Sequence, residues 1–295
     1  MRLAQTRNAL FHLGMVASLA LVSLPATALT QVLYDAAVQP NVAPPGQGWL
    51  GSGFFGMTQT ISAAGTELIP TGSLPNNAFG GFSNRLAPIS FPPFQVHAGA
   101  LVNPAFPLLL RDAGYSLTLG FRVRNESHSS NDRAGFSITL IGNDLQGIEL
   151  GFQAGSIFAQ AAAPSLFVAA ENNLSTAVTS LLADYRVWQL DVLGGEYVLS
   201  QGGKAVLSGA LRDYSSYSGF GEDAYRTRNF LFLGDNTSSA QAAFGISYAA
   251  ITTAVPEPSA YALLLAGLAF TCWLGLARRV APPRVSPPDT GHLPD

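Results

Sequence analysis

The chain has 295 residues and a formal net charge of −3 at pH 7, with 15 Lys and Arg against 18 Asp and Glu. That balance excludes a protein built around a basic nucleic-acid-binding face, which needs clustered Lys and Arg. The single cysteine, Cys272, excludes disulfide bonds within the chain and a metal site built from several cysteines.

The first 28 residues have the features of a secretory signal peptide. Arg2 and Arg7 are positively charged, an apolar stretch from Leu13 to Leu24 follows, and Ala26-Thr27-Ala28 supplies small residues. Signal peptidase accepts this order of charge, apolar run and small-residue site. The sequence therefore predicts a signal helix over residues 1–28 that is removed on export. The alternative is a buried first helix of the fold.

Residues 29–254 are long enough for one sizeable domain and read as short strands separated by turns. Apolar and polar residues alternate with a period of two, which predicts strands with one buried face. On this pattern Arg122 and Arg124 should point to solvent or to an acidic partner. Glycine-containing turns, spaced about ten residues apart, favour an antiparallel sandwich. The expected strands are Gln31 to Asp35, Tyr115 to Val123, Phe136 to Leu140, Ile148 to Phe152, Tyr185 to Val192, Glu196 to Ser200, Lys204 to Leu207, Asn229 to Leu233 and Phe244 to Ile251.

Two regions are less regular. Residues 40–110 contain Pro44-Pro45, Pro92-Pro93 and many glycines. They indicate loops and short edge strands, because proline lacks the N–H that a central strand needs. Leu174 to Leu182 is a candidate short helix.

Two pairs of polar residues are candidate calcium ligands. Asn131-Asp132 and Asp235-Asn236 offer carboxylate and amide oxygens on expected loops, and calcium takes oxygen ligands of this kind. The alternative for Asn131-Asp132 is a turn cap with an ion pair to Arg133 or Arg124. The alternative for Asp235-Asn236 is a polar turn in which the side chains bond their own backbone. Apart from calcium, no cofactor is expected.

An acidic residue and several tyrosines gather between two expected strands. Asp213, Tyr214, Tyr217 and Tyr225 belong to a serine-rich segment that looks like a loop. Exposed aromatic rings can stack on sugar faces while a carboxylate bonds hydroxyl groups, so these four residues are candidate glycan contacts. The alternative is that the tyrosines pack over the end of the sandwich and cover its core.

The sequence does not predict an enzyme. A glycosidase would need two carboxylates about 5 to 10 Å apart, but the same-face neighbours of Glu149 are Gly147, Gly151 and Gln153. A serine hydrolase of the nucleophile-elbow type would need a Gly-x-Ser-x-Gly segment, which the chain lacks. His128 lies in a serine-rich run, which indicates a loop residue.

The C-terminal region predicts one membrane crossing. Ala260 to Ala277 is a run of 18 uncharged residues. As a helix the run would be about 27 Å long, close to the length needed to span a bilayer. Arg278 and Arg279 follow directly, and positive residues beside a span tend to stay cytoplasmic. The proline-rich tail 280–295 would then be cytoplasmic and residues 29–254 would lie outside.

This region also resembles a known sorting signal. Val255-Pro256-Glu257-Pro258, the apolar run and then Arg278-Arg279 resemble a PEP-CTERM signal over residues 255–279. The resemblance implies cleavage near Pro-Glu-Pro by an exosortase, a membrane transpeptidase, in a Gram-negative host that makes exopolysaccharide. The signals of this family usually end soon after their arginines, whereas this chain continues from Val280 to Asp295. The alternative is a protein that stays anchored in the membrane by this segment.

Within residues 115–252, several segments resemble the choice-anchor Y domains of PEP-CTERM proteins. They are Asn125 to Phe136, Asp144 to Phe152, Leu211 to Tyr214 and Asn229 to Ser238. The hairpins from Tyr185 to Gly209 resemble the concanavalin A and laminin-G type of jelly roll, which commonly binds sugars or other surfaces. These resemblances imply a fold and a location, not a chemical activity.

We therefore expect an all-β protein, an antiparallel jelly-roll sandwich of the concanavalin A-like type between a signal helix and a transmembrane helix. Its expected role is structural or adhesive, in exopolysaccharide or biofilm, at the outer cell envelope or outside the cell after transient anchoring in the inner membrane. The expected partners are signal peptidase, exosortase, the membrane and exopolysaccharide, and not nucleic acid. The alternative is a carbohydrate-binding module, assisted by calcium.

Overall fold

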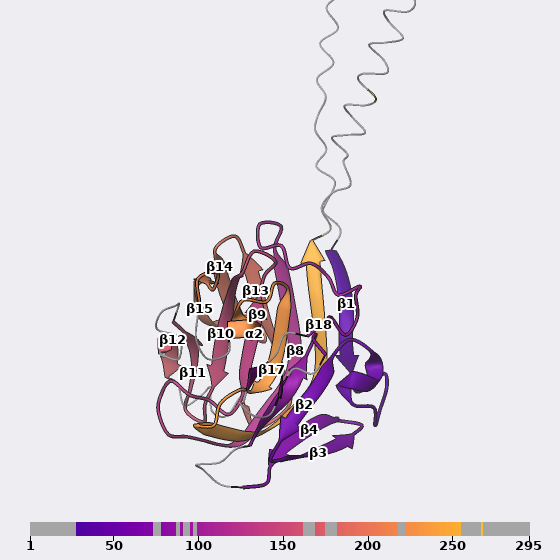
Figure 1. The fold of residues 1–295 in the computed structure, drawn as a ribbon, viewed down its shortest axis with the longest axis vertical. Helices are drawn as coiled ribbons and strands as arrows, with labels where there is room; N and C mark the ends of the chain where they lie inside the picture. The colour runs from indigo at the N-terminus through magenta and orange to yellow at the C-terminus, as the bar shows by residue number, and fades with distance from the viewer. Residues whose placement is uncertain are drawn as a thin grey trace, which may run out of the picture.

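A computed structural model describes residues 28–72, 78–86, 89–90, 95–96, 99–161, 169–174, 182–217, 222–254 and Gly267 of the 295-residue chain. They form two antiparallel β-sheets packed face to face, with very little helix (Figure 1). The predicted all-β antiparallel sandwich is thus confirmed.

Sheet A has eight strands, and the longest two, β8 and β18, lie side by side within it. β1 and β4 both pair with β18, at different heights along its length. In spatial order the sheet contains β15 (Lys204–Ala210), β14 (Glu196–Gln201), β13 (Arg186–Leu193), β8 (Tyr115–His128), β18 (Ala240–Ala254), β4 (Gly65–Pro70) and β3 (Met57–Ser62), with β1 (Ala28–Asp35) beside β18.

Sheet B also has eight strands, and short elements connect or flank the two sheets. In spatial order it contains β12 (Ala169–Leu174), β11 (Ser156–Gln160), β10 (Gln146–Phe152), β9 (Ser137–Ile141), β17 (Phe230–Asp235), β5 (Phe79–Ser83) and β2 (Gly51–Phe55), with β16 (Arg212–Asp213) beside β10. The remaining elements are the pair β6 (Ile89–Ser90) and β7 (Gln95–Val96), the 3-10 helix η1 (Pro44–Gln47) and the single turn α2 (Glu222–Tyr225).

Glycines form the turns of two hairpins in sheet A. Gly202 and Gly203, which join β14 to β15, have φ of 56° and 77°. A two-residue turn that matches the twist of its strands needs positive φ, which glycine adopts without strain. Gly194, with φ of 59°, begins the equivalent turn between β13 and β14.

Aromatic side chains fill the core between the sheets. Phe121 and Trp188 from sheet A lie against Phe152 of sheet B and Phe136, directly before β9. The ring centroids are 4.9 to 5.9 Å apart. All four are at most 1% exposed. Burial of such rings is the main source of stability in a chain without disulfides.

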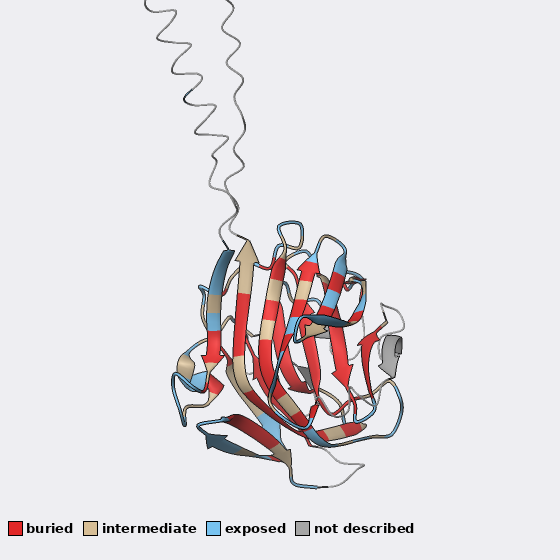
Figure 2. Ribbon diagram, turned by 180° about the vertical axis from the view of Figure 1, so that it is seen from behind, coloured by how far each residue is buried: buried red, intermediate tan, exposed pale blue. Residues whose placement is uncertain are grey.

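The two sheets differ in how their outer faces are covered. In sheet A, buried residues alternate with more exposed ones along β13 and β14 (Figure 2). In sheet B, every residue of β9, β11 and β17 is buried. A second apolar cluster on its outer side contains Ile141, Leu145, Tyr214, Tyr217, Ala224, Tyr225, Phe230 and Phe232. Residues 212–217 and 222–230 therefore cover sheet B.

Most strand predictions hold, with local differences. Arg122 and Arg124 both pair with Glu67 of β4, as expected of outward arginines next to an acidic partner. β8 continues to His128, so the prediction of a loop around this histidine was wrong. Leu174 ends a strand rather than beginning a helix, and residues 175–181 lie outside the described part.

The two terminal segments cannot be compared with their predictions. The signal helix, residues 1–28, lies outside the described residues except for Ala28, and the apolar run Ala260 to Ala277 does so except for Gly267. Among the residues that the structure does describe, no helix is long and apolar enough to cross a bilayer.

Candidate functional site

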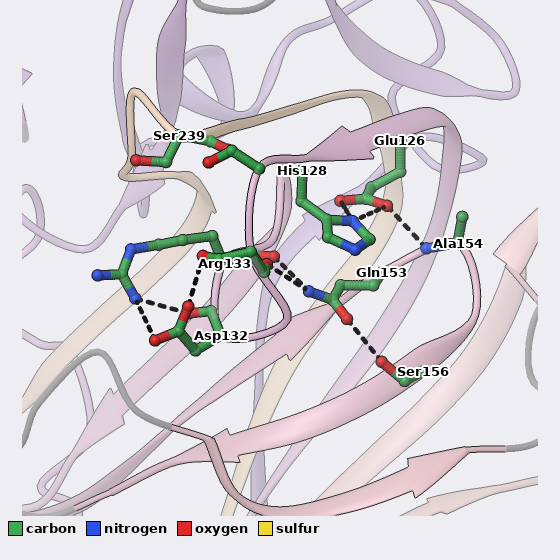
Figure 3. Close-up of polar contacts among 10 residues, drawn as sticks. Glu126, His128, Asp132, Arg133, Gln153, Ala154, Ser156 and Ser239 are labelled. Carbon is green, nitrogen blue, oxygen red and sulfur yellow. Dashed lines mark hydrogen bonds and ion pairs between the residues drawn. The ribbon is translucent and has the colours of Figure 1, made fainter.

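Buried polar side chains collect at one end of the sandwich, which we call the tip. There β8 ends, β18 begins, and loops 129–136, 153–155 and 236–239 meet. The amide of Ser129 donates to the carbonyl of Ser239 at 2.9 Å, which joins the first and third loops. Figure 3 shows the side chains that connect the first two.

A β-bulge turns one carboxylate of the tip inward. Asn125 has φ of 52°, and the pairing of β8 with β18 shifts by one residue opposite it. An extra residue of this kind changes the face to which the following side chain points. As a result the side chain of Glu126 is 2% exposed, although Arg122 and Arg124 on the same strand point outward.

Glu126 and His128 form the centre of the tip. Nδ1 of His128 lies 3.0 Å from both carboxylate oxygens of Glu126, and the amide of Ala154 donates to Oε2 of Glu126 at 2.8 Å (Figure 3). Burial raises the pKa of Glu126, while the Ala154 amide and the charge of His128 oppose that rise. The pair ties the end of β8 to the turn between β10 and β11.

Gln153 supplies a second connection between the same loops. Its Nε2 donates to the carbonyl of Arg133 at 2.5 Å and to that of Ser130 at 3.3 Å. Its Oε1 accepts from the hydroxyl of Ser156 at 2.7 Å. An amide buried with both ends bonded fixes loop geometry, because leaving either end unbonded would cost free energy.

The first pair of expected calcium ligands is engaged within its own loop. Oδ1 of Asp132 accepts from the hydroxyl of Ser130 at 2.5 Å, and its Oδ2 lies 3.4 Å from Nη1 of Arg133. Asn131 is exposed. This is the turn cap with an Arg133 ion pair that the sequence offered as the alternative.

The second expected pair, Asp235-Asn236, lies at the same end of the sandwich, but its side chains bond other residues than the first pair does. Oδ1 of Asp235 accepts from the amide of Thr237 at 3.0 Å, and Asn236 donates from Nδ2 to Oε1 of Glu149 at 3.1 Å. Asp235 is fully buried, and its Oδ2 has no hydrogen-bond partner among the described residues. Burial raises the pKa of this carboxyl well above its ordinary range.

The two pairs of candidate calcium ligands do not belong to a larger cluster of acidic or histidine side chains in the described part of the chain. No group of three or more His, Cys, Asp or Glu side chains in the described part is placed to hold a metal ion. Asp132 is bonded to Ser130 and Arg133, and Asp235 is buried in the interior. Calcium binding by the four candidate ligands stays a prediction.

The candidate glycan contacts are placed differently from expectation. Tyr214, Tyr217 and Tyr225 are 0%, 6% and 3% exposed and pack together, with ring centroids 5.2 Å apart in both contacts of Tyr225. Buried rings offer no face to a sugar, so the reading of exposed stacking tyrosines was wrong and the covering role is the observed one. Asp213 is exposed, and its carboxylate accepts from the amide of Ser215 at 2.9 Å.

The sequence analysis considered the carboxylate beneath these tyrosines, Glu149, only as a possible glycosidase group and did not predict its contact with them. Glu149 points from β10 to the outer face of sheet B, where it accepts from the hydroxyl of Tyr225 and the amide of Asn236. It is 3% exposed, and burial raises its pKa despite those hydrogen bonds. Gly151, two residues from Glu149, leaves room for the ring of Phe158 on the neighbouring strand β11.

The sorting-signal residues Val255, Pro256, Glu257, Pro258, Arg278 and Arg279 lie outside the described residues. Ala254, the last residue of β18, pairs with Ala28, the first residue of β1.

No protein-family model matches the chain, and no curated protein matches its sequence. Several solved structures are similar. A carbohydrate esterase from Shiga toxin-encoding bacteriophage phi24B is 12% identical with a TM-score of 0.45, over 77% of this chain and 100% of that one. A lectin from Bauhinia forficata in complex with GalNAc is 14% identical with a TM-score of 0.41, over 77% and 99%. The exoplasmic/lumenal domain of VIP36 is 9% identical with a TM-score of 0.41, over 76% and 88%. At these values the function has to be argued from the chain's own residues.

Proposed function

We propose that this chain is an exported cell-surface or matrix protein, sorted by an exosortase, with a structural or adhesive role in exopolysaccharide. Its sandwich would be a jelly roll of the concanavalin A-like type. Residues 1–28 would be the signal peptide, 29–254 the extracellular domain, 255–279 the sorting signal with its transmembrane helix, and 280–295 a cytoplasmic tail. Signal peptidase and exosortase would act on its two ends.

The observation that carries the proposal is the pairing of Ala28 with Ala254. Both candidate processing segments are therefore connected to the same end of the sandwich, at the paired strands β1 and β18. β18 runs from Ala240 at the tip to Ala254, so the tip lies at the opposite end of the same strand (Figure 1). A chain held by residues after Ala254 would present the tip away from its point of attachment.

Composition supports an extracellular role for the domain. Lys204 is the only lysine between residues 29 and 254, and acidic residues outnumber basic ones there. Without cysteines in this part of the chain, burial of aromatic and aliphatic side chains has to stabilise the sandwich outside the cell.

A second candidate, a carbohydrate-binding module, is favoured by exposed and half-buried polar side chains on the outer face of sheet A. A row of polar side chains crosses that face. The hydroxyl of Thr30 lies 2.9 Å from that of Thr252, and Asp191 accepts from Ser116 at 2.5 Å and from Gln189 at 2.7 Å. Hydroxyl, amide and carboxylate groups in a fixed row can exchange hydrogen bonds with the hydroxyls of a sugar chain.

Processing in the native host tests the first candidate. With the exosortase gene intact, the protein should be recovered from the envelope or matrix without its C-terminal tail. With the gene deleted, the full tail should remain and the protein should stay with the inner membrane. An unchanged C-terminus in both strains would remove the sorting proposal.

A polysaccharide-binding assay tests the second. Retention of the sandwich on a neutral polysaccharide should weaken in Gln189→Ala, while Thr58→Ala on β3, outside the row, should bind normally. Equal retention of the two variants would argue against the row as a sugar site.

A further inference from the structure

Leucine side chains are exposed at the end of the sandwich where the chain leaves it. Leu193 is 67% exposed, Leu108 58%, Leu29 56% and Leu110 40%. Leu29 pairs with Thr253, next to the last residue of β18, and Leu193 is the last residue of β13. We call the surface formed by these four leucines the exit face.

Residues 107–114 place two of the leucines on this face. Leu109 is fully buried, and its amide donates to Oδ1 of Asn229 at 2.7 Å. The segment therefore closes the end of the core with its middle leucine, while Leu108 and Leu110 on either side remain exposed.

Backbone hydrogen bonds connect residues 107–114 to the end of β18 and to the β13–β14 turn. The amide of Ala254 donates to the carbonyl of Gly114 at 3.4 Å, and that of Gly194 donates to the carbonyl of Arg111 at 2.8 Å. The side chain of Leu193 lies close to Gly114, since a Cβ added there would be 3.2 Å from Cδ1 of Leu193. Figure 1 shows the end of β18 and the β13–β14 hairpin at the same end of the sandwich.

The sequence limits how far this face can be from a membrane. Five residues, 255–259, separate Ala254 from the uncharged run Ala260 to Ala277. Even fully extended, the six steps from Ala254 to Ala260 span at most about 22 Å. A bilayer that holds the run therefore holds the exit face within reach of its headgroup region.

We propose that the exit face rests on the bilayer, with Leu29, Leu108, Leu110 and Leu193 inserted among the lipid headgroups. This inference rests on the proposed membrane anchoring and deepens it. The occupant is a lipid surface, because exposed leucines next to a short tether meet that surface before any other partner.

The charges around the leucines favour a zwitterionic surface. Arg111 is engaged by Asp144, with Nε 2.5 Å from Oδ2. Asp112 and Glu196 are exposed on the same end. Arg228 is also exposed there and donates to the carbonyl of Asn143. The exit face thus carries charges of both signs, so docking would depend mainly on apolar insertion and not on anionic lipid.

Docking would fix the orientation of the domain relative to the membrane. The exit face would lie against the membrane before cleavage, and the tip would point away from it. The segment cut by the exosortase would be held in the headgroup region, where a membrane enzyme can reach it.

Spin labels in the full-length chain test the proposal. The chain would be placed in phosphatidylcholine nanodiscs after Cys272→Ser, with one label at Leu193→Cys or, as the matched control, at Val187→Cys. Val187 is on the same strand and 58% exposed, but about 20 Å farther from the exit face at the spacing of a β-strand. A second pair is Leu110→Cys and Phe54→Cys, which are 40% and 39% exposed.

The labels at Leu193 and Leu110 should show higher accessibility to oxygen and lower accessibility to a water-soluble nickel chelate than their controls. If the chain resists carbonate extraction but all four labels show the same accessibilities as a label in water, docking is overturned and the membrane anchor is not. Release of the chain by carbonate would overturn the anchor and docking together.

Discussion

Tyr225 donates its hydroxyl proton to Oε2 of Glu149, which connects α2 to the outer face of sheet B across 76 residues of sequence. Asn236 donates to the other oxygen of the same carboxylate. One buried carboxylate therefore binds both the segment that covers sheet B and loop 236–239 of the tip.

Tyr225→Phe should destabilise the fold, because it removes a hydrogen bond to a buried acidic group. We expect a loss of about 1.5–3 kcal/mol in the free energy of unfolding, measured in urea. Tyr115→Phe is the control: that ring is also buried, but its hydroxyl has no hydrogen-bond partner among the described residues. Similar losses in both variants would show that the Glu149 contact is not specific.

The buried carboxyls should make the protein more stable in weak acid than at neutral pH. Burial raises the pKa of Glu149 and of Asp235 above their ordinary values of 4.5 and 3.8. A raised folded pKa contributes stability that is complete below the ordinary pKa and is lost as pH rises through the folded pKa. The Ser215 amide lowers the pKa of Asp213, so this carboxylate contributes stability that is lost as the pH falls. Its contribution changes only at pH values near and below its ordinary pKa.

Asp235→Asn tests this explanation. Each unit of pKa shift corresponds to about 1.4 kcal/mol, so the neutral amide should flatten the fall in stability as the pH rises above the ordinary pKa of 3.8. Thermal melting of the two proteins across that rise in pH is the measurement. A wild-type melting temperature that climbs steadily from weak acid to pH 8, with the variant parallel to it, would contradict the assignment.

Gly135 should tolerate no side chain, because it lies against the start of β18. A Cβ there would be 2.0 Å from the carbonyl carbon of Gln241 and 2.3 Å from the amide nitrogen of Ala242. Gly135→Ala should cost about 1–3 kcal/mol through displaced backbone. Gly155→Ala, at another loop of the tip with nothing within 4 Å of the added carbon, should be nearly neutral in the same denaturation experiment.

Phe136 should be among the most sensitive core positions. Its ring lies 4.9 Å from that of Phe121 and 5.0 Å from that of Phe244. Phe136→Ala should cost about 3–5 kcal/mol, whereas Val187→Ala on the exposed face of β13 should stay within about 0.5 kcal/mol. Guanidinium unfolding would measure both, and equal small losses would contradict the placement of the aromatic core.

The sequence predicted those parts of the fold that depend on local alternation. Ile148, Leu150 and Phe152 are buried in the core as their period of two indicated. The pairing of β1 with β18 could not be predicted in the same way, because no local pattern links residues from opposite ends of the domain.

Two local errors at the candidate site have physical causes. The left-handed Asn125 interrupts the alternation of β8 and turns Glu126 inward, and a period-of-two pattern contains no information about such a bulge. Tyr214, Tyr217 and Tyr225 looked like exposed loop residues because their segment is rich in serine. They are buried because the segment folds back on a sheet whose outer face carries Glu149 and apolar residues.

The intact mass of the mature protein from its native host tests the central claim most directly. If the two ends are processing signals that leave the sandwich together at Ala28 and Ala254, the mass should correspond to a chain that begins near Leu29 and ends near Pro256. A chain that still carries Met1 and Asp295 and is recovered from the soluble cytosolic fraction would contradict the account.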